Sequence, residues 1–166
     1  MPIRIELLDP KRHDRAAFGC GVPALDSYLK TRASQDANRN ISTTFCLVDE
    51  DSPKEILGYY TLAPGGLDLT DVPEALQKQL PAYPQVPVFR LGRLAVRTDR
   101  QDAGLGTQLL VSALGMCLTN PLSAWAVVVD ALPSARDFYL WFGFESFFDD
   151  GEHLFMTMAD IRKTLG

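Results

Sequence analysis

Histidine and cysteine are scarce in this sequence, and neither is placed for metal binding. The 166 residues include two histidines, His13 and His153, and three cysteines, Cys20, Cys46 and Cys117. An odd number of widely spaced cysteines predicts neither a disulfide framework nor a zinc site. We therefore expect no bound metal.

Long apolar runs are missing as well. No stretch approaches the about 20 residues that span a bilayer, and residues 1–10 alternate charged with apolar side chains instead of forming the apolar core of a signal peptide. We expect a cytoplasmic protein with no membrane partner. The length suits one sizeable core, so residues 1–166 are expected to form a single domain.

Positive charge is in deficit overall. Lys and Arg number 16 against 21 Asp and Glu, a net charge of −5, which excludes a protein that grips nucleic acid over its whole surface. The distribution is uneven, however. Arg90, Arg93, Arg97 and Arg100 fall within eleven residues, with Asp99 as the only acid among them. These arginines predict a local site for an anion.

Apolar residues at strand and helix spacing predict the order of elements. Pro64, Gly65 and Gly66 are expected to end one strand, and residues 68–87, with four prolines, to form a surface excursion holding a short helix around 74–80. Strands alternating with helices favour a mixed sheet with helices on both sides. The strands are expected at 3–7, 43–48, 56–62, 88–96, 124–129, 144–148 and 154–158, and the longer helices at 23–37, 105–117, 133–142 and 159–165.

The most informative stretch joins the strand at 88–96 to the helix that begins near Leu105 through Gln101-x-x-Gly104-x-Gly106. Residues without a Cβ let a ligand approach the backbone, and the first N–H groups of a helix have no intrahelical partner. Together they predict a phosphate site. The alternative is a plain strand-to-helix turn that needs glycine for its own geometry. The helix has one apolar stripe, made of Leu105, Leu109, Leu110, Ala113, Leu114 and Cys117.

Two common phosphate-binding loops do not fit these residues. A P-loop requires Gly-Lys-Ser/Thr, but Gly106 is followed by Thr107 and Gln108. A dinucleotide fingerprint requires a third glycine, and Leu109 occupies that position.

Instead, the loop following Leu94-Ala95-Val96 resembles the acetyl-CoA loop of the GNAT N-acetyltransferase superfamily. The stretch from Phe138-Tyr139 to Phe142-Gly143-Phe144 is similar to that family's second signature. The resemblance implies the α/β (α+β) GNAT fold: a mixed, mostly antiparallel sheet with helices on both sides and a splayed central strand pair. One strand of this pair would carry residues 94–96 and the other residues 127–129.

The resemblance also implies the cofactor, acetyl-CoA, and its site. Backbone N–H groups of Leu94, Ala95 and Val96 match the place that binds the thioester carbonyl, and Tyr139 matches the tyrosine that protonates the leaving thiolate. The alternative for Tyr139 is a packed core aromatic. The residues that match the pyrophosphate loop are Gln101, Asp102, Ala103, Gly104, Leu105, Gly106 and Thr107.

Asp102 departs from the family pattern, which often has Gly or Arg there and a basic residue next. A carboxylate beside a pyrophosphate costs affinity unless it points to solvent, and Arg97 or Arg100 would have to offset it.

No residue stands out as a general base. An α-amine, with a pKa near 8, needs a base less than a lysine amine near 10.4 does. A site without an evident base therefore suits an α-amine acceptor, or a proton that is relayed through water.

Further segments resemble one bacterial branch of the family, the toxins of toxin–antitoxin pairs. Membership would imply acetylation of the α-amino group of aminoacyl-tRNA, with Arg90, Arg93, Arg97 and Arg100 as candidate tRNA contacts. It would also imply a ribbon–helix–helix antitoxin, and a homodimer is a further expectation. Two alternatives stay open: an acetyltransferase of a small amine or protein N-terminus, and a catalytically degenerate domain that binds CoA or a partner. The similar segments are Phe18 to Lys30, Gly58 to Ala63, Pro87 to Val96 and Phe155 to Met158.

Overall fold

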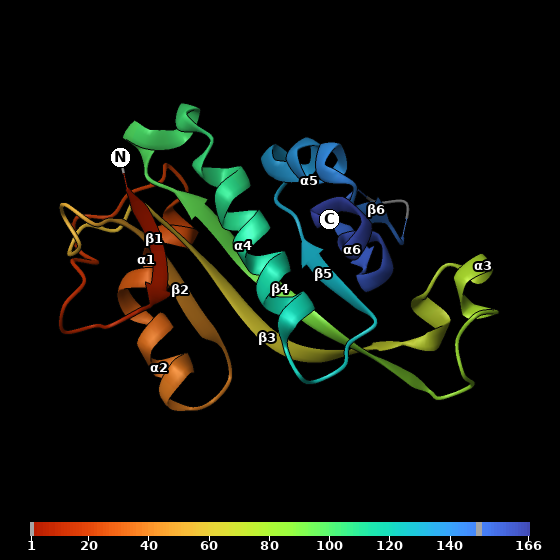
Figure 1. The fold of residues 1–166 in the computed structure, drawn as a ribbon. Helices are drawn as coiled ribbons and strands as arrows, with labels where there is room; N and C mark the ends of the chain where they lie inside the picture. The colour runs from red at the N-terminus through yellow and green to blue at the C-terminus, as the bar shows by residue number, and fades with distance from the viewer. Residues whose placement is uncertain (1, 149–150) are drawn as a thin grey trace. The chain divides into compact units, whose positions relative to one another are not determined.

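A seven-stranded mixed sheet forms the centre of the computed structural model, which describes residues 2–148 and 151–166 (Figure 1). The strand order is β1-β2-β3-β4-β5-β7-β6. The pair β4–β5 is parallel, whereas β1–β2, β2–β3, β5–β7 and β6–β7 are antiparallel. The expected mixed, mostly antiparallel sheet is confirmed. The strands are β1 (Ile3–Leu7), β2 (Thr43–Asp49), β3 (Gly58–Asp68), β4 (Gln85–Val96), β5 (Ala126–Asp130), β6 (Glu145–Ser146) and β7 (His153–Thr157).

Six α-helices and three short 3-10 turns accompany the strands in the described residues. The chain divides into two compact units: the first unit comprises residues 1–63 and 92–113, and the second unit residues 64–91 and 114–166. The helices are α1 (Pro23–Thr31), α2 (Ala33–Asn38), α3 (Glu74–Gln77), α4 (Leu105–Thr119), α5 (Arg136–Phe142) and α6 (Met158–Leu165), and the turns are η1 (Leu69–Asp71), η2 (Thr98–Ala103) and η3 (Pro133–Ala135).

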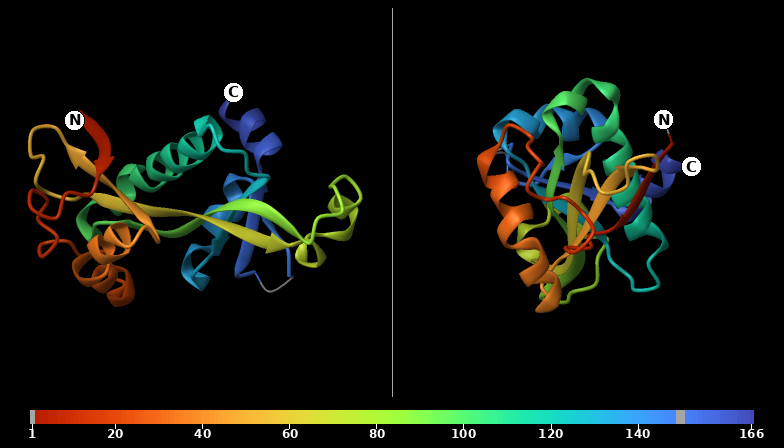
Figure 2. Two further views of the ribbon diagram at one scale, coloured as in Figure 1. Left: turned by 90° about the horizontal axis from the view of Figure 1, so that it is seen from below. Right: turned by 90° about the vertical axis from the view of Figure 1, so that its left-hand side faces the viewer.

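In the first unit, helices cover both faces of the sheet (Figure 2). Successive side chains of a strand point to opposite faces, and the two tyrosines of β3 show where each face leads. Tyr59 packs with α1 and α2, and its hydroxyl donates to Leu25 O over 2.6 Å. The hydroxyl of Tyr60 lies 3.0 Å from Oγ of Ser112 in α4. The prediction of helices on both sides is therefore confirmed within this unit.

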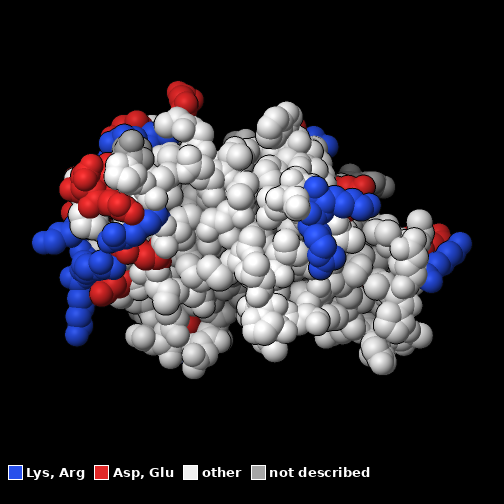
Figure 3. All heavy atoms as spheres, viewed as in Figure 1, with Lys and Arg blue, Asp and Glu red and all other residues white. Residues whose placement is uncertain are grey.

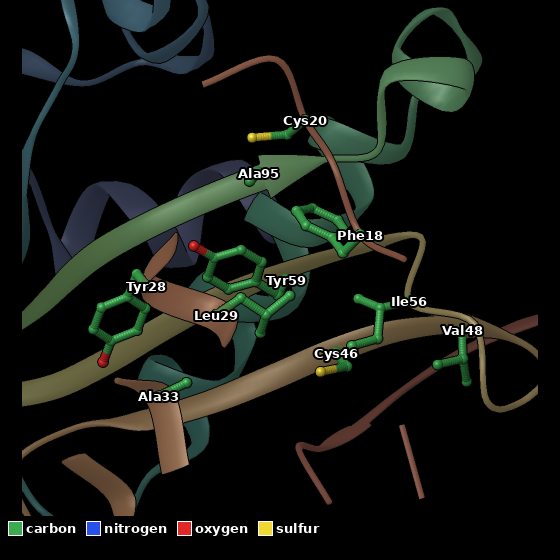
Figure 4. Close-up of a cluster of buried hydrophobic side chains, with 10 residues drawn as sticks. All are labelled: Phe18, Cys20, Tyr28, Leu29, Ala33, Cys46, Val48, Ile56, Tyr59 and Ala95. Carbon is green, nitrogen blue, oxygen red and sulfur yellow. The ribbon is translucent and has the colours of Figure 1, made fainter. Parts of the chain in front are cut away.

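The core of the first unit lies between α1–α2 and strands β2, β3 and β4 (Figure 4). Phe18 meets the Tyr59 ring edge-on at 5.6 Å, and Leu29 and Ala33 bring the apolar faces of the two helices onto the strands. Fully burying one such large side chain stabilises the folded state by about 1.5–3 kcal/mol. Ala95 belongs to this cluster, so the core fixes the end of β4 from which the predicted cofactor loop departs.

In the second unit, β5 is buried on both faces. Its residues Ala126 to Val129 all lie inside, which explains why the sequence there is apolar without alternation. One face packs into a cluster that includes Val88, Val128 and Phe155. The parallel ladder runs from Val88 opposite Ala126 to Leu91 opposite Val129, and β4 continues beyond it to Val96.

Two sequence-based expectations about element boundaries were wrong. The strand expected to stop at Pro64 continues to Asp68. A Cβ at Gly66 would lie 2.8 Å from Gln85 Oε1, so glycine here admits a close neighbour instead of ending the strand. The helix expected over residues 23–37 is two helices, α1 and α2, separated at Arg32, whose φ of −116° departs from helical values.

Candidate functional site

The predicted cofactor loop consists of η2 and the first turn of α4, all within the first unit. Gly104 joins them with φ 76° and ψ 11°, the left-handed conformation. A Cβ at this position would meet nothing within 4 Å, so the glycine is required by the backbone conformation and its surroundings are open. The first intrahelical bond runs from Gln108 N to Gly104 O over 3.3 Å. The N–H groups of Leu105, Gly106 and Thr107 therefore precede the helix's own bonds, as an anion site requires.

Gln101 anchors this loop. Its Nε2 donates to Cys20 O over 2.8 Å and to Val96 O over 3.0 Å. Both N–H bonds of the amide are used, so the side chain positions the loop and only the main chain of Gln101 is available to an anion. The loop is tied down again at Thr98, whose N–H and hydroxyl both donate to Gly19 O over 2.9 Å. Sequence reasoning missed residues 19–20 as the support of the loop.

The remaining residues of the predicted cofactor site divide into buried and exposed groups. Ala95 is buried, and Leu94 and Val96 are half-buried. Asp102, Ala103 and Thr107 are exposed. Because Asp102 is exposed, water screens its negative charge, so its carboxylate should lower the affinity of a nearby anion site only slightly. The roles assigned to all these residues remain predictions.

The four clustered arginines have different surroundings. Arg97 donates to both carboxylate oxygens of Asp99, over 2.7 and 3.1 Å, and lies 3.8 Å from Glu55. The hydrogen bonding that Arg97 donates to Asp99 raises the pKa of Arg97 and lowers the pKa of Asp99. With these partners Arg97 is not available to offset Asp102.

The other three arginines do not share the environment of Arg97. Arg90, in the second unit, lies 3.7 Å from Asp130. Arg93 carries its guanidinium over the ring of Tyr28, with Cζ 3.5 Å from the ring centroid. Arg100 makes contacts of its own within the protein. The four arginines are thus neighbours in sequence, but they do not share the same partners.

Tyr139, the predicted proton donor, belongs to α5 in the second unit. Its side chain is 4% exposed, and its ring meets those of Phe138 and Phe144 edge-on at 5.2 and 5.4 Å. Burial raises the pKa of Tyr139 above its ordinary value, which keeps the phenol protonated. No hydrogen bond to its hydroxyl is formed among residues 2–148 and 151–166. The ring is therefore packed among aromatic neighbours, and no described residue holds its hydroxyl.

Other reactive groups are few in the described part of the chain. All three cysteines are buried; burial raises the pKa of Cys20 to about 11 and that of Cys46 and Cys117 to about 12, so none is a thiolate nucleophile. The described residues contain no cluster of metal ligands, and none of their helices is long and apolar enough to cross a membrane.

Helix α4 has an uncharged surface. Figure 3, which shows one face of the molecule, has a largely white area over this helix. The helix itself has no charged residue from Leu105 to Thr119. This helix therefore offers no charged side chain to a polyanion.

Comparison with known proteins identifies relatives of the whole chain. The family model described as acetyltransferase (GNAT) domain matches residues 74–165. The tRNA-acetylating toxin of Mycobacterium tuberculosis is 35% identical over 156 residues, which cover 92% of this chain and 91% of that protein.

Two solved structures are similar to this chain over nearly its whole length. AtaT complexed with acetyl-methionyl-tRNAfMet is similar with a TM-score of 0.89 and 27% identity, covering 99% of this chain and 100% of that chain. A tyrosine-to-phenylalanine variant of AtaT, bound to the C-terminus of the antitoxin AtaR and to acetyl-CoA, has a TM-score of 0.80 and 26% identity, covering 97% and 96%.

Proposed function

The chain belongs to the GNAT family of acetyltransferases, and from this premise we propose that it moves the acetyl group of acetyl-CoA to the α-amino group of an aminoacyl-tRNA, as the toxin of a toxin–antitoxin pair. The observation that carries the proposal is the 35% identity, over 92% of the chain, to a protein described as a tRNA-acetylating toxin. An acetylated α-amine cannot form a peptide bond, so the product would stop translation.

The loop after β4 is proposed to hold the pyrophosphate of acetyl-CoA. The fit rests on the left-handed, unobstructed Gly104 and on the N–H groups at the start of α4. Gln101 holds the loop in place through Cys20 and Val96. When bound, the cofactor supplies an acetyl group already activated as a thioester. Backbone N–H groups of residues 94–96 are proposed to bind the thioester carbonyl oxygen, where negative charge grows during transfer.

Tyr139 is proposed to give its phenolic proton to the departing sulfur. A general acid must be protonated at working pH and must have a donor that is not already committed. Burial raises the pKa of this phenol, and its hydroxyl makes no hydrogen bond within the described chain. The uncommitted hydroxyl is the property that separates Tyr139 from a core tyrosine, whose hydroxyl usually has a partner.

The acceptor is proposed to be an α-amine because the chain lacks an evident general base. An α-amino group has a pKa near 8 and is partly neutral at physiological pH without help. The overall charge of −5 argues that the RNA is recognised near its aminoacylated end rather than along its length.

The same relatives support an antitoxin as a partner. AtaT has been solved with the C-terminus of its antitoxin AtaR, and we propose an antitoxin of the ribbon–helix–helix class for this chain. A homodimer is proposed as its active assembly. The protein would act in the cytoplasm, where aminoacyl-tRNA and acetyl-CoA are both found.

A cell-free translation reaction tests the proposal. Wild-type protein should stop synthesis only when acetyl-CoA is present, and Tyr139→Phe should not stop it. Fresh aminoacyl-tRNA added after removal of the protein should restore synthesis. Arrest that does not depend on acetyl-CoA would contradict the proposal. Continued synthesis in the presence of folded wild-type protein and acetyl-CoA would contradict it as well.

A further inference from the structure

Arg93 is held in an unusual way for a charged side chain on a strand. Its Cζ lies 3.5 Å from the centroid of the Tyr28 ring, a separation that requires the guanidinium plane to stack on the ring. Stacking covers one face of the group. The N–H bonds lie in its plane, so they point away from the ring and stay available to a ligand.

Among residues 2–148 and 151–166, no carboxylate or carbonyl accepts a hydrogen bond from those N–H bonds, and the guanidinium is held by its contact with the Tyr28 ring. This separates Arg93 from Arg97, which is bound to Asp99 on two oxygens, and from Arg90, which faces Asp130. An arginine that a protein holds in place without giving it a carboxylate is suited to bind an anion from outside.

The support beneath Arg93 is rigid. Tyr28 is 5% exposed, and its hydroxyl donates to Asp36 Oδ2 over 2.7 Å, which links α1 to α2. The ring is therefore fixed by packing on one side and by a hydrogen bond at its tip. A guanidinium held on such a ring loses less conformational freedom on binding a ligand than a mobile arginine does. This increases its affinity for a planar, bidentate partner.

We propose that Arg93 binds a backbone phosphate of the acceptor RNA close to its aminoacylated end, an assignment that rests on the function proposed above. Arg93 immediately precedes residues 94–96, the segment proposed to hold the thioester carbonyl, so a ligand on Arg93 lies beside the acetyl group to be transferred. The pyrophosphate of the cofactor is assigned to residues 101–107, beyond the end of β4. The anion at Arg93 therefore belongs to the acceptor.

The test compares Arg93→Ala with Arg162→Ala, which removes the same charge from exposed α6. Initial rates are measured on an aminoacyl-tRNA over a range of salt concentrations and on an amino-acid ester, a phosphate-free acceptor. Loss of a charge-assisted contact should lower kcat/KM for the tRNA about ten- to hundredfold and reduce the salt slope by about 1. Turnover of the ester should be unchanged, and Arg162→Ala should behave as wild type on both acceptors.

Two additional measurements make the outcome decisive. Acetyl-CoA affinity, from calorimetry, should be the same in Arg93→Ala and wild type; a tenfold loss would assign the phosphate to the cofactor and overturn the proposal. Arg93→Lys keeps the charge and replaces Arg93→Ala in the test if that variant does not fold. It should retain the wild-type salt slope but have a lower kcat/KM for the tRNA. Wild-type rates in a folded Arg93→Ala would also overturn it. If the wild-type protein neither binds nor acetylates aminoacyl-tRNA, the proposed function fails, and Arg93 with it.

Discussion

Replacing Tyr139 with phenylalanine removes one oxygen and leaves the packing intact. The ring contacts to Phe138 and Phe144 do not involve the hydroxyl, which has no hydrogen-bond partner in the described chain. The free energy of unfolding should change by less than about 0.5 kcal/mol, because an intramolecular hydrogen bond, typically worth about 1 kcal/mol, is not lost. Tyr59→Phe provides the contrast, since Tyr59 donates to Leu25 O over 2.6 Å, and it should cost at least about 1 kcal/mol.

The effect of Tyr139→Phe on catalysis should be much larger than its effect on stability. Removing a general acid typically lowers the rate about 10²–10⁴-fold, and a hundredfold loss corresponds to about 2.7 kcal/mol of transition-state stabilisation. Acetyl-CoA affinity should be unchanged, so the loss should appear in kcat. In the wild type, burial raises the pKa of Tyr139. The neutral phenol is the donor, so rising pH should not remove this proton until above the ordinary tyrosine range near 10.

Steady-state acetyl transfer to aminoacyl-tRNA, with thermal unfolding of the same samples, measures both effects. Tyr83→Phe is the matched control, because Tyr83 is 68% exposed and should tolerate the change in both assays. The reasoning is refuted if Tyr139→Phe retains wild-type kcat. A loss of activity accompanied by a lower acetyl-CoA affinity or by destabilisation above about 1 kcal/mol would instead assign Tyr139 to packing.

Three further substitutions or treatments test other parts of the structure. Gly58→Ala should destabilise the fold by about 1–3 kcal/mol in denaturant titration, because its Cβ would lie 2.8 Å from both Ala95 O and Leu109 Cδ1; unchanged stability would refute this packing. Gly106→Val should raise the acetyl-CoA dissociation constant at least tenfold, about 1.4 kcal/mol, and equal affinity in a folded variant would remove Gly106 from the cofactor site. Because burial raises the pKa of Cys20 to about 11, its reaction with a thiol reagent at pH 8 should be roughly a hundredfold slower than that of a free cysteine; a fast reaction in the folded protein would contradict its burial.

The strand, loop and helix around Gly104 could be predicted from the sequence because the determinants are local. A strand that is β-branched at its ends, a glycine in the left-handed conformation and an apolar stripe at helical spacing each depend on near neighbours along the chain. All six stripe residues, from Leu105 to Cys117, are buried. The same locality explains the confirmed terminal elements, β7 and α6.

Features that depend on distant residues could not be predicted. The side chain of Gln101 donates a hydrogen bond to Cys20 O, 81 positions away, so the sequence could not show that this side chain holds the loop. Gly66 looked like a strand breaker because its close neighbour, Gln85, comes from another strand. The four arginines looked equivalent in sequence, but Asp130, Asp99 and Tyr28 give Arg90, Arg97 and Arg93 different surroundings.

The most direct test of the central claim identifies the acetylated atom. Purified protein is incubated with acetyl-CoA and a fully charged tRNA pool, the aminoacyl esters are hydrolysed, and the released amino acids are analysed by mass spectrometry. The account predicts at least one amino acid that is heavier by one acetyl group on its α-nitrogen, formed only while it is attached to tRNA. Acetylation of free amines or protein N-termini with no acetylated amino acid from the tRNA pool would contradict it.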